Sequence, residues 1–400
     1  MSVEFRTLTE RDELTAACRV FWRSMVGLPP LGSIDPVPGL EPGRFLGAFD
    51  GGELVGCADS YTSWLTVPGG ARVPHAAVTH VGVLPTHTRR GIMTELLVGQ
   101  LTDCRRRGEI TASLCASEAG IYERFGYAIA TTAASGRLIR DQARLREGAA
   151  PSGLIRLADQ PDASRLLAGI YEPAAWNGSI CRPEGWWLLH HLAQQAEPIK
   201  PYRAVHGDPG HEDGFVLYRP TEPERWLGSH QRTVVVEDFV AHSAAAYLGL
   251  MRHLLSLDLV DVLEFATLPA DDPLPMLLTD ARALREVQLR DEAWLRLVDV
   301  AAALGARGYR PGGSVVIEVE DPVLPANTGR YRISGSGAAR TAEPAGIAVG
   351  VAALAAAYLG GTKWWQLARA GRAVELLPGS LADADELFGV SRLPYSGTSF

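Results

Sequence analysis

The chain has 400 residues, and its 38 basic and 46 acidic side chains give a formal net charge of −8. At about 150 residues per domain, this length corresponds to two or three domains. Hydrophobic residues make up 46% and charged residues 21%, which excludes a disordered or fibrous protein. The negative charge argues against a dedicated nucleic-acid-binding protein. The five widely spaced cysteines include no C-x-x-C pair, so they indicate a reducing cytosol rather than a disulfide framework or a zinc ribbon.

The N-terminal part predicts a helix, a long loop and a pair of strands. Its charged start is not a signal peptide. Apolar residues at helical spacing predict an amphipathic helix over Arg11–Val26, capped by Thr9. Residues 27–43 are rich in Pro and Gly and predict an irregular loop, whose acids Asp35 and Glu41 either line a pocket for cationic amines or are solvated. The strands FLGAFD and ELVGCADSYTSWLTV follow, joined by a Gly-Gly turn.

Residues 76–140 predict a strand–helix–strand crossover. The strand AAVTHVGVLP leads through a short turn into a helix over Gly91–Arg107, and the strand EITASLCAS follows. The first turn of a helix has unpaired N–H groups and a positive dipole end, and Gly91 would let a pyrophosphate approach the backbone. Arg89 and Arg90 add positive charge beside it. The turn is either an anion site or an ordinary turn with two solvated arginines.

The remainder of the chain predicts a linker and two further units. The segment GAAPSG, residues 148–153, has the composition of a linker, and residues 154–290 mix helices with strands such as FVLYR and RTVVVEDFV. A small α+β unit begins near residues 294–309. The apolar stretch Ala345–Gly361 is mostly Ala and Gly, so it favours a buried strand running into a buried helix over a membrane span. The ten histidines show no metal-ligand spacing, and no metal is expected.

Two segments of the chain resemble a known superfamily. VTHVGVLPTHTRRGIM and ASEAGIYERFGY resemble the signature segments of the GNAT superfamily of acyl-CoA N-acyltransferases, roughly V-x-P-x-x-[RQ]-x-x-G-x-[GA] and Y-x-x-x-G-[FY]. Thr88 stands where Arg or Gln is usual, and Met93 where Gly or Ala is usual. The segments LEFATLPADDPLPMLLTDAR, WLRLVDVAAAL and YLGGTKWWQLARAGR extend the likeness over nearly the whole chain, which resembles the Eis (enhanced intracellular survival) family.

This resemblance implies an α+β fold of tandem GNAT-like mixed α/β domains, followed by a small sterol-carrier-protein-like α+β domain. The catalytic GNAT domain, which binds acetyl-CoA, is expected over residues 1–150. A second GNAT-like domain without a cofactor loop is expected over 151–290. The sterol-carrier-like domain over 291–400 would donate the C-terminal carboxylate to the active site. The resemblance also implies a cytoplasmic homo-oligomer, expected to be a hexamer, with no nucleic-acid or membrane partner.

The resemblance further implies the site residues. Tyr122 matches the general acid that protonates the departing CoA thiolate, although on its own it could be a packing aromatic beside Phe125. The α-carboxylate of Phe400 matches the general base. Acetyl-CoA would be bound by the strand that pairs with the pantetheine arm, by the pyrophosphate loop and by the end of the neighbouring strand. These residues are Val81, Gly82 and Val83; Arg89, Arg90, Gly91, Ile92, Met93 and Thr94; and Ser117 and Glu118.

The implied activity is acetyl-CoA-dependent N-acetylation of a small-molecule amine. The expected acceptors are primary amines of aminoglycosides or similar polyamine or lysine-like compounds, acetylated directly in a ternary complex without an acyl-enzyme. Two alternatives stay open. One is a non-catalytic protein that binds acyl-CoA or an apolar ligand, and the other is a biosynthetic N-acyltransferase for one specific metabolite.

Overall fold

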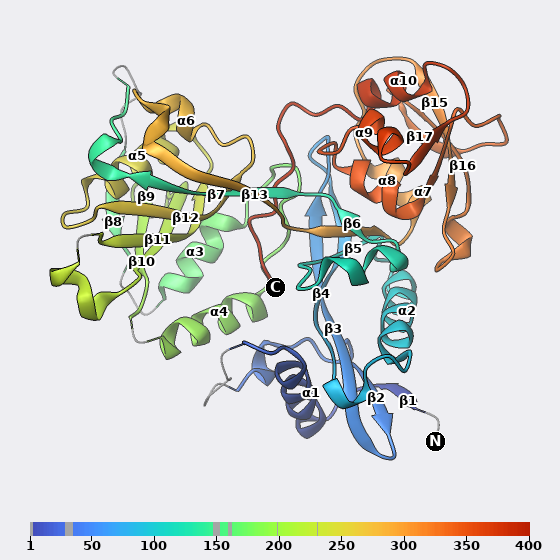
Figure 1. The fold of residues 1–400 in the computed structure, drawn as a ribbon, viewed down its shortest axis with the longest axis horizontal. Helices are drawn as coiled ribbons and strands as arrows, with labels where there is room; N and C mark the ends of the chain where they lie inside the picture. Colours follow the sequence, from blue (N-terminus) through green and yellow to red (C-terminus); the bar gives the residue numbers. More distant parts are fainter. Residues whose placement is uncertain (1–2, 29–34, 147–152, 159–161, 198, 230) are drawn as a thin grey trace. The chain divides into compact units, whose positions relative to one another are not determined.

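The computed structural model describes residues 3–28, 35–146, 153–158, 162–197, 199–229 and 231–400. The chain folds into two compact units, and neither is continuous in sequence (Figure 1). The first unit consists of Met1–Thr131, Ala175–Leu189 and Asp291–Phe400, and the second of Thr132–Ala174 and His190–Arg290. The predicted linker over residues 148–153 lies almost entirely outside the described residues.

The first unit contains a seven-stranded sheet in the order β1-β2-β3-β4-β5-β14-β6. Only β4 and β5 run parallel, joined by α2, and the other neighbours are antiparallel. The elements are β1 (Glu4–Thr7), α1 (Arg11–Ser24), β2 (Leu46–Asp50), β3 (Glu53–Thr66), β4 (Arg72–Val83), α2 (Ile92–Arg106), β5 (Thr111–Leu114), β6 (Ala128–Ile129) and β14 (Trp294–Leu297).

The local elements of this sheet follow the sequence pattern. Both predicted helices form within two residues of their predicted ends. The hairpin between β2 and β3 turns at Gly51 and Gly52, whose positive φ angles of 60° and 87° suit glycine. The predicted N-cap is wrong, because α1 follows Glu10 and its start has no side-chain cap. The hydroxyl of Thr9 instead donates to the Glu10 carboxylate at 3.4 Å.

The strand β14 comes from a distant part of the sequence. It lies between β5 and β6 and is antiparallel to both. Its Arg296 forms an ion pair with Asp321, and both side chains are fully buried. A segment predicted to open the C-terminal α+β unit therefore also completes the first sheet.

The C-terminal part of the first unit has its own five-stranded sheet, in the order β17-β16-β15-β18-β19. The apolar stretch predicted as strand then helix forms β18 and α8, and every α8 residue except Ala352 is buried. Tyr331, Tyr358 and Trp364 fill the core of this part. The elements are α7 (Val300–Ala306), β15 (Ser314–Glu320), β16 (Gly329–Ser334), β17 (Gly337–Arg340), β18 (Ile347–Gly350), α8 (Val351–Tyr358), α9 (Trp364–Arg369), β19 (Ala373–Glu375) and α10 (Ser380–Leu387).

The second unit is built on another seven-stranded sheet, in the order β13-β7-β12-β11-β10-β9-β8. Its strands are β7 (Thr132–Ile139), β8 (Ile155–Leu157), β9 (Tyr202–His206), β10 (Gly214–Pro220), β11 (Thr233–Ala241), β12 (Val262–Pro269) and β13 (Leu284–Asp291). Its helices are α3 (Ala163–Tyr171), α5 (Ala244–Ser256) and α6 (Leu274–Leu277), while α4 (Glu184–Ala196) begins within Ala175–Leu189. β11 and β12 are parallel and joined by α5. Within the described residues, no helix has both the length and the apolar character needed to cross a bilayer.

Candidate functional site

The turn between β4 and α2 has the geometry of an anion site. Gly91 is the N-cap of α2 with φ 80°, and no atom lies within 4 Å of the place where a Cβ would stand. The side chain of Ile92 is buried in the core and that of Met93 packs against it, so both could serve a ligand only through their backbone N–H groups. Thr94 is exposed in the first turn of the helix.

The two arginines of this turn differ in their partners. Arg89 is exposed, has φ 62° and makes no hydrogen bond or ion pair within the described residues. Arg90 donates to Asp50 at 2.7 Å, and this hydrogen bond lowers the pKa of Asp50. His87 also approaches that carboxylate, at 3.5 Å. Arg89 is therefore the cation available to a bound anion, while Arg90 holds the turn against the β2–β3 hairpin.

The corresponding helix of the second unit begins differently. α5 also follows a parallel strand, but its N-cap is Ser243, whose hydroxyl accepts from Ala246 N at 3.0 Å. The same hydroxyl donates to the Asp213 carboxylate at 2.6 Å. Because a side-chain cap and a carboxylate occupy this N-terminus, it is unsuited to a pyrophosphate. That the second domain has no cofactor loop stays a prediction.

The strand β4 is irregular near Val81, Gly82 and Val83, the residues that the family resemblance assigns to the pantetheine arm. Gly82 pairs with Cys57 and Thr79 with Asp59, so two residues of β4 stand opposite one residue of β3 in a β-bulge. His80 and Val81, which lie between these pairs, therefore stand outside the regular pairing with β3. A Cβ on Gly82 would lie 2.2 Å from the Ser24 Oγ atom, which shows how closely α1 lies on this strand.

The side chains on either side of Gly82 point into the core. Val81 and Val83 pack with α2 residues, so any contact of these positions with a pantetheine arm would be made by the backbone. β5, the parallel neighbour of β4, ends at Leu114, and the predicted residues Ser117 and Glu118 lie exposed three to four residues beyond it.

Tyr122 lies between two short 3-10 turns, Ala119–Ile121 and Glu123–Phe125. Its side chain is only 5% exposed. Burial raises the pKa of its phenol, the negative charge of Glu118 raises it further, and a hydrogen bond with Ser117 opposes them. The hydroxyl is thus held in its protonated form at neutral pH, which is the state required of a proton donor.

The segment that follows Tyr122 is anchored by the distant strand β14. Gly126 has φ 86°, and a Cβ there would lie 2.8 Å from the Arg296 guanidinium. Phe125 and Tyr127 are buried in the same core cluster as Tyr122. The conformation of the Tyr122 loop therefore depends on the buried Arg296–Asp321 ion pair.

The last residues of the chain are bound along the first unit. Glu292 accepts hydrogen bonds from the backbone N–H groups of Ser396 and Gly397, at 2.9 and 2.7 Å. Arg182 donates to the Thr398 hydroxyl at 3.1 Å, and the Trp186 indole donates to the Ser399 carbonyl at 2.7 Å. These contacts order the segment, although chain ends usually fray.

The final aromatic ring has a defined partner. Phe400 packs edge-to-face against Tyr61 of β3, with ring centroids 5.7 Å apart. The end of the chain therefore lies beside the first GNAT-like sheet, next to the two strands that form the bulge (Figure 1).

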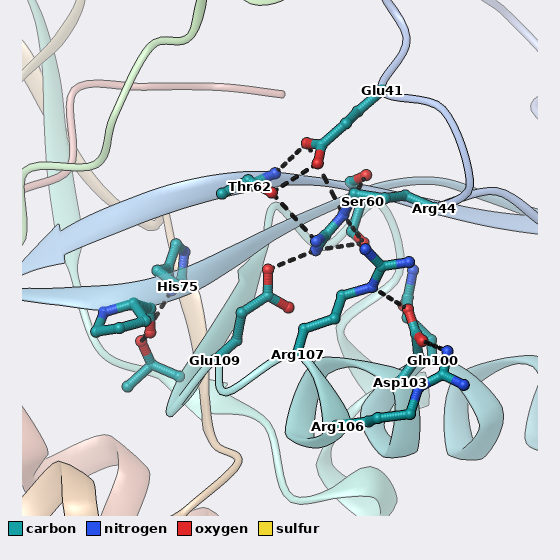
Figure 2. A network of polar contacts seen from close by, with 12 residues as sticks. Glu41, Arg44, Ser60, Thr62, His75, Gln100, Asp103, Arg106, Arg107 and Glu109 are labelled. Atoms are coloured by element: carbon teal, nitrogen blue, oxygen red, sulfur yellow. Dashed lines mark hydrogen bonds and ion pairs between the residues drawn. The ribbon is translucent and has the colours of Figure 1, made fainter.

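The two loop acids proposed as amine ligands are engaged in other contacts. Figure 2 shows Glu41 accepting from the backbone N–H and the hydroxyl of Thr62, at 2.6 and 2.7 Å. Beside it, the buried Arg44 pairs with Glu109 at 2.7 Å, and burial raises the pKa of Glu109. Asp35 forms an ion pair with Arg11. The network of Glu41 and Arg44 fixes the end of the loop to β3 and to the end of α2.

The sequence reasoning missed the residues that hold the tail and the loop. Arg182 and Glu292 are more than 100 residues from the groups of the tail that they contact. Arg296 lies in the segment WLRLVDVAAAL, but it approaches Gly126, which is 170 residues earlier in the chain. No local pattern could have identified these long-range contacts. Within the described part of the chain, no group of three or more His, Cys, Asp or Glu side chains could hold a metal ion.

Three family models match the chain in succession. Two acetyltransferase (GNAT) domain models match residues 5–130 and 178–297, and a sterol carrier protein domain model matches residues 300–397. The predicted α+β fold of two GNAT-like domains and a sterol-carrier-like domain is therefore confirmed.

Relatives with known names match along most of the chain. An uncharacterised N-acetyltransferase of Streptomyces avermitilis is 36% identical, over 89% of both chains. The N-acetyltransferase Eis of Mycobacterium tuberculosis is 34% identical over 82% of this chain and 81% of its own. The crystal structure of Eis1 from Mycobacterium abscessus is 53% identical with a TM-score of 0.93, and the match covers all of both chains. Together with the GNAT turn, the Tyr122 segment and the bound C-terminus, these matches show that the chain belongs to the Eis family of GNAT N-acetyltransferases.

Proposed function

We propose that this N-acetyltransferase transfers the acetyl group of acetyl-CoA to a primary amine of an aminoglycoside, or of a similar polyamine or lysine-like acceptor. The transfer is direct, within a ternary complex. The observation that carries this proposal is the bound C-terminus, which brings Phe400 to Tyr61 on the catalytic sheet. A carboxylate at this position suits a cationic amine, because it attracts the ammonium group and can accept its proton.

The proposed cofactor site follows from the geometry of β4 and α2. The N–H groups at Gly91 and the first turn of α2, with Arg89, bind the pyrophosphate. The backbone of Val81 to Val83 pairs with the pantetheine arm, and the end of β5 with Ser117 and Glu118 lines the same cleft. Acetyl-CoA is the acetyl donor that acetyltransferases of this fold use. The contrast with the capped start of α5 supports a single cofactor site, in the first unit.

The proposed chemistry uses one proton acceptor and one proton donor. The α-carboxylate of Phe400, the last residue of the sequence, takes a proton from the acceptor ammonium, and the free amine attacks the thioester carbonyl. N–H groups of the β4 bulge polarise that carbonyl. Tyr122 then donates its proton to the departing thiolate, in keeping with the raised pKa of its phenol. No covalent acyl-enzyme forms.

The experiment is release of the CoA thiol from acetyl-CoA in the presence of kanamycin-like aminoglycosides, spermidine or lysine derivatives. Tyr122→Phe should lower kcat about 10²- to 10⁴-fold, the range for loss of a general acid. Tyr127→Phe is the matched control, because the Tyr127 hydroxyl is buried without a hydrogen-bond partner. Residues added after Phe400 should abolish turnover, whereas the same residues added before Met1 should not. Full activity of the C-terminally extended chain would exclude the carboxylate as the base.

Oligomeric state and location are part of the same proposal. Val374, Leu376 and Leu377 form an exposed apolar run at β19, each about half exposed. Such a run favours contact with another copy of the chain, and we propose the hexamer of the family. Native mass spectrometry tests this assembly. All five cysteines are free thiols, which supports a reducing compartment such as the cytoplasm.

A further inference from the structure

The bulge of β4 carries a histidine in a strained conformation. His80 has φ 48°, in the left-handed region that is unfavourable for a non-glycine residue. Three aromatic rings hold its imidazole in place: Phe21 edge-on at 5.0 Å, Phe45 stacked at 5.8 Å and Trp22 tilted at 5.9 Å. Strain that the surroundings maintain in this way is typical of functional positions.

A buried carboxylate faces this imidazole. The Asp59 Oδ2 atom lies 3.3 Å from His80 Nδ1, and its Oδ1 atom accepts from Ser60 N at 2.8 Å. The Asp59 side chain is 3% exposed, and burial raises its pKa. A buried carboxylate costs free energy that an amide or an apolar residue would not. Its position opposite a histidine is therefore a reason to look for a chemical role of the pair.

The pair leaves the other ring nitrogen of His80 as a hydrogen-bond acceptor. A carboxylate at Nδ1 selects the tautomer that carries its proton there and leaves Nε2 as the acceptor. His80 Nε2 makes no hydrogen bond to any described residue, and the side chain is 11% exposed. His75, on the same strand, differs because both of its ring nitrogens are bonded, to Thr111 and Ser113.

Asp59 is the charged group that faces His80 among the elements packed around it. From α1 comes Cys18, and from β3 comes Cys57, whose thiol donates to the His80 carbonyl. Burial raises the pKa of both thiols, that of Cys18 to about 12, so both are neutral. Arg44, next to Phe45, forms an ion pair with Glu109 and donates a hydrogen bond to the Ser60 carbonyl of β3.

The pair lies on the same face of β3 as the bound C-terminus. Asp59 and Tyr61 are two residues apart, so their side chains point to one face at a spacing of about 7 Å. The ring of Tyr61 packs against the ring of Phe400. The histidine, its carboxylate and the residue that contacts Phe400 thus lie along the same β3–β4 pair.

We propose that His80, oriented by Asp59, receives the proton released from the acceptor amine and passes it to solvent. This inference rests on the proposed acetyl transfer. Conversion of R–NH₃⁺ and acetyl-CoA to the amide and CoA thiol releases one net proton. The ammonium N–H bond breaks, its electron pair stays on nitrogen, and the proton passes through the Phe400 carboxylate to Nε2. Nδ1 keeps its proton, and Asp59 neutralises the imidazolium.

The carboxylate alone is a poor store for this proton. A chain-terminal carboxyl group ordinarily titrates at about pH 3.5 and loses its proton at once at neutral pH, whereas an imidazole titrates near 6.5. An imidazole that receives the proton keeps it away from the amine while the thioester is attacked.

The test compares His80→Gln and Asp59→Asn with wild type, and His75→Gln serves as the matched control on the same strand. His80→Gln should lower kcat about 10- to 100-fold, leave the KM for acetyl-CoA unchanged and remove the acidic limb of the pH profile of kcat. Added imidazole should restore part of the rate of His80→Ala. Asp59→Asn should lower kcat without lowering the Tm, because it removes a buried charge. His75→Gln should keep the wild-type profile.

A second measurement does not depend on turnover. In ¹⁵N-histidine NMR spectra, His80 should carry its proton on Nδ1 and titrate at Nε2, and Asp59→Asn should reduce the Nδ1–H population. Identical pH profiles for wild type and His80→Gln, or an Nε2 atom that does not titrate, would overturn the inference. If no amine is acetylated by wild type while Nε2 titrates as expected, the proposed function has failed and the inference about proton transfer falls with it.

Discussion

Replacing Arg296 by methionine should remove about 3–5 kcal/mol of stability. The Arg296 guanidinium donates to both oxygens of Asp321, at 2.8 and 2.7 Å, in a pair that is fully buried. Without it, the carboxylate keeps only the N–H groups of Val323, Leu324 and Asn327 as donors. Loss of one partner leaves an uncompensated buried charge, which accounts for the expected size of the effect.

Equilibrium urea unfolding followed by tryptophan fluorescence measures this loss. Arg330→Met is the matched control, because the Arg330–Glu318 pair at 3.1 Å is about 40% exposed on both sides and should contribute about 1 kcal/mol or less. Adding Asp321→Asn to Arg296→Met should recover part of the stability, since it removes the unpaired charge. A loss below 1 kcal/mol for Arg296→Met, or a double variant less stable than the single one, would refute the reasoning.

Three other perturbations have defined outcomes. Gly126→Ala should lower both Tm and kcat, because its Cβ would lie 2.8 Å from the Arg296 guanidinium. Gly91→Ala has open space around its Cβ and should mainly raise the KM for acetyl-CoA. Calorimetry and initial rates distinguish the two effects. Burial lowers the pKa of His75 to about 3, so below pH 6.5 the unfolded chain binds a proton at this residue that the folded chain does not. The free energy of unfolding should therefore fall by up to about 1.4 kcal/mol per pH unit below pH 6.5. His75→Gln should make this dependence on pH weaker. Arg182→Met should expose the C-terminal segment to carboxypeptidase and lower kcat, and unchanged proteolysis would argue against its anchoring role.

The sequence predicted the elements whose pattern is local. The helix of α2, the Gly51–Gly52 hairpin and the strand–helix pair at β18 and α8 depend on neighbouring residues, and each forms close to its predicted place. The insertion of β14 between β5 and β6 could not be predicted in this way. Its residues pair with strands that lie 165 to 186 residues earlier in the chain. The sequence of a short buried strand does not show which strands it pairs with.

The candidate site shows the same difference between features set by neighbouring residues and features set by distant ones. Short motifs predict Gly91 and Tyr122 as site residues, and this stays a prediction. The loop around Tyr122 and the segment that ends at Phe400 are held by distant side chains such as Arg296 and Arg182. The strain at His80 also has no signal in the sequence, because a bulge depends on the register of two strands.

The discontinuity of the first unit constrains the order in which the protein can fold during synthesis. The ribosome completes the last segment of the second unit, which ends at Arg290, before it has made β14. The first seven-stranded sheet therefore stays incomplete, without the strand between β5 and β6, until β14 has been made. Nascent chains released early would lack β14, the strand between β5 and β6, so premature termination should yield inactive, aggregation-prone fragments rather than partly active enzyme.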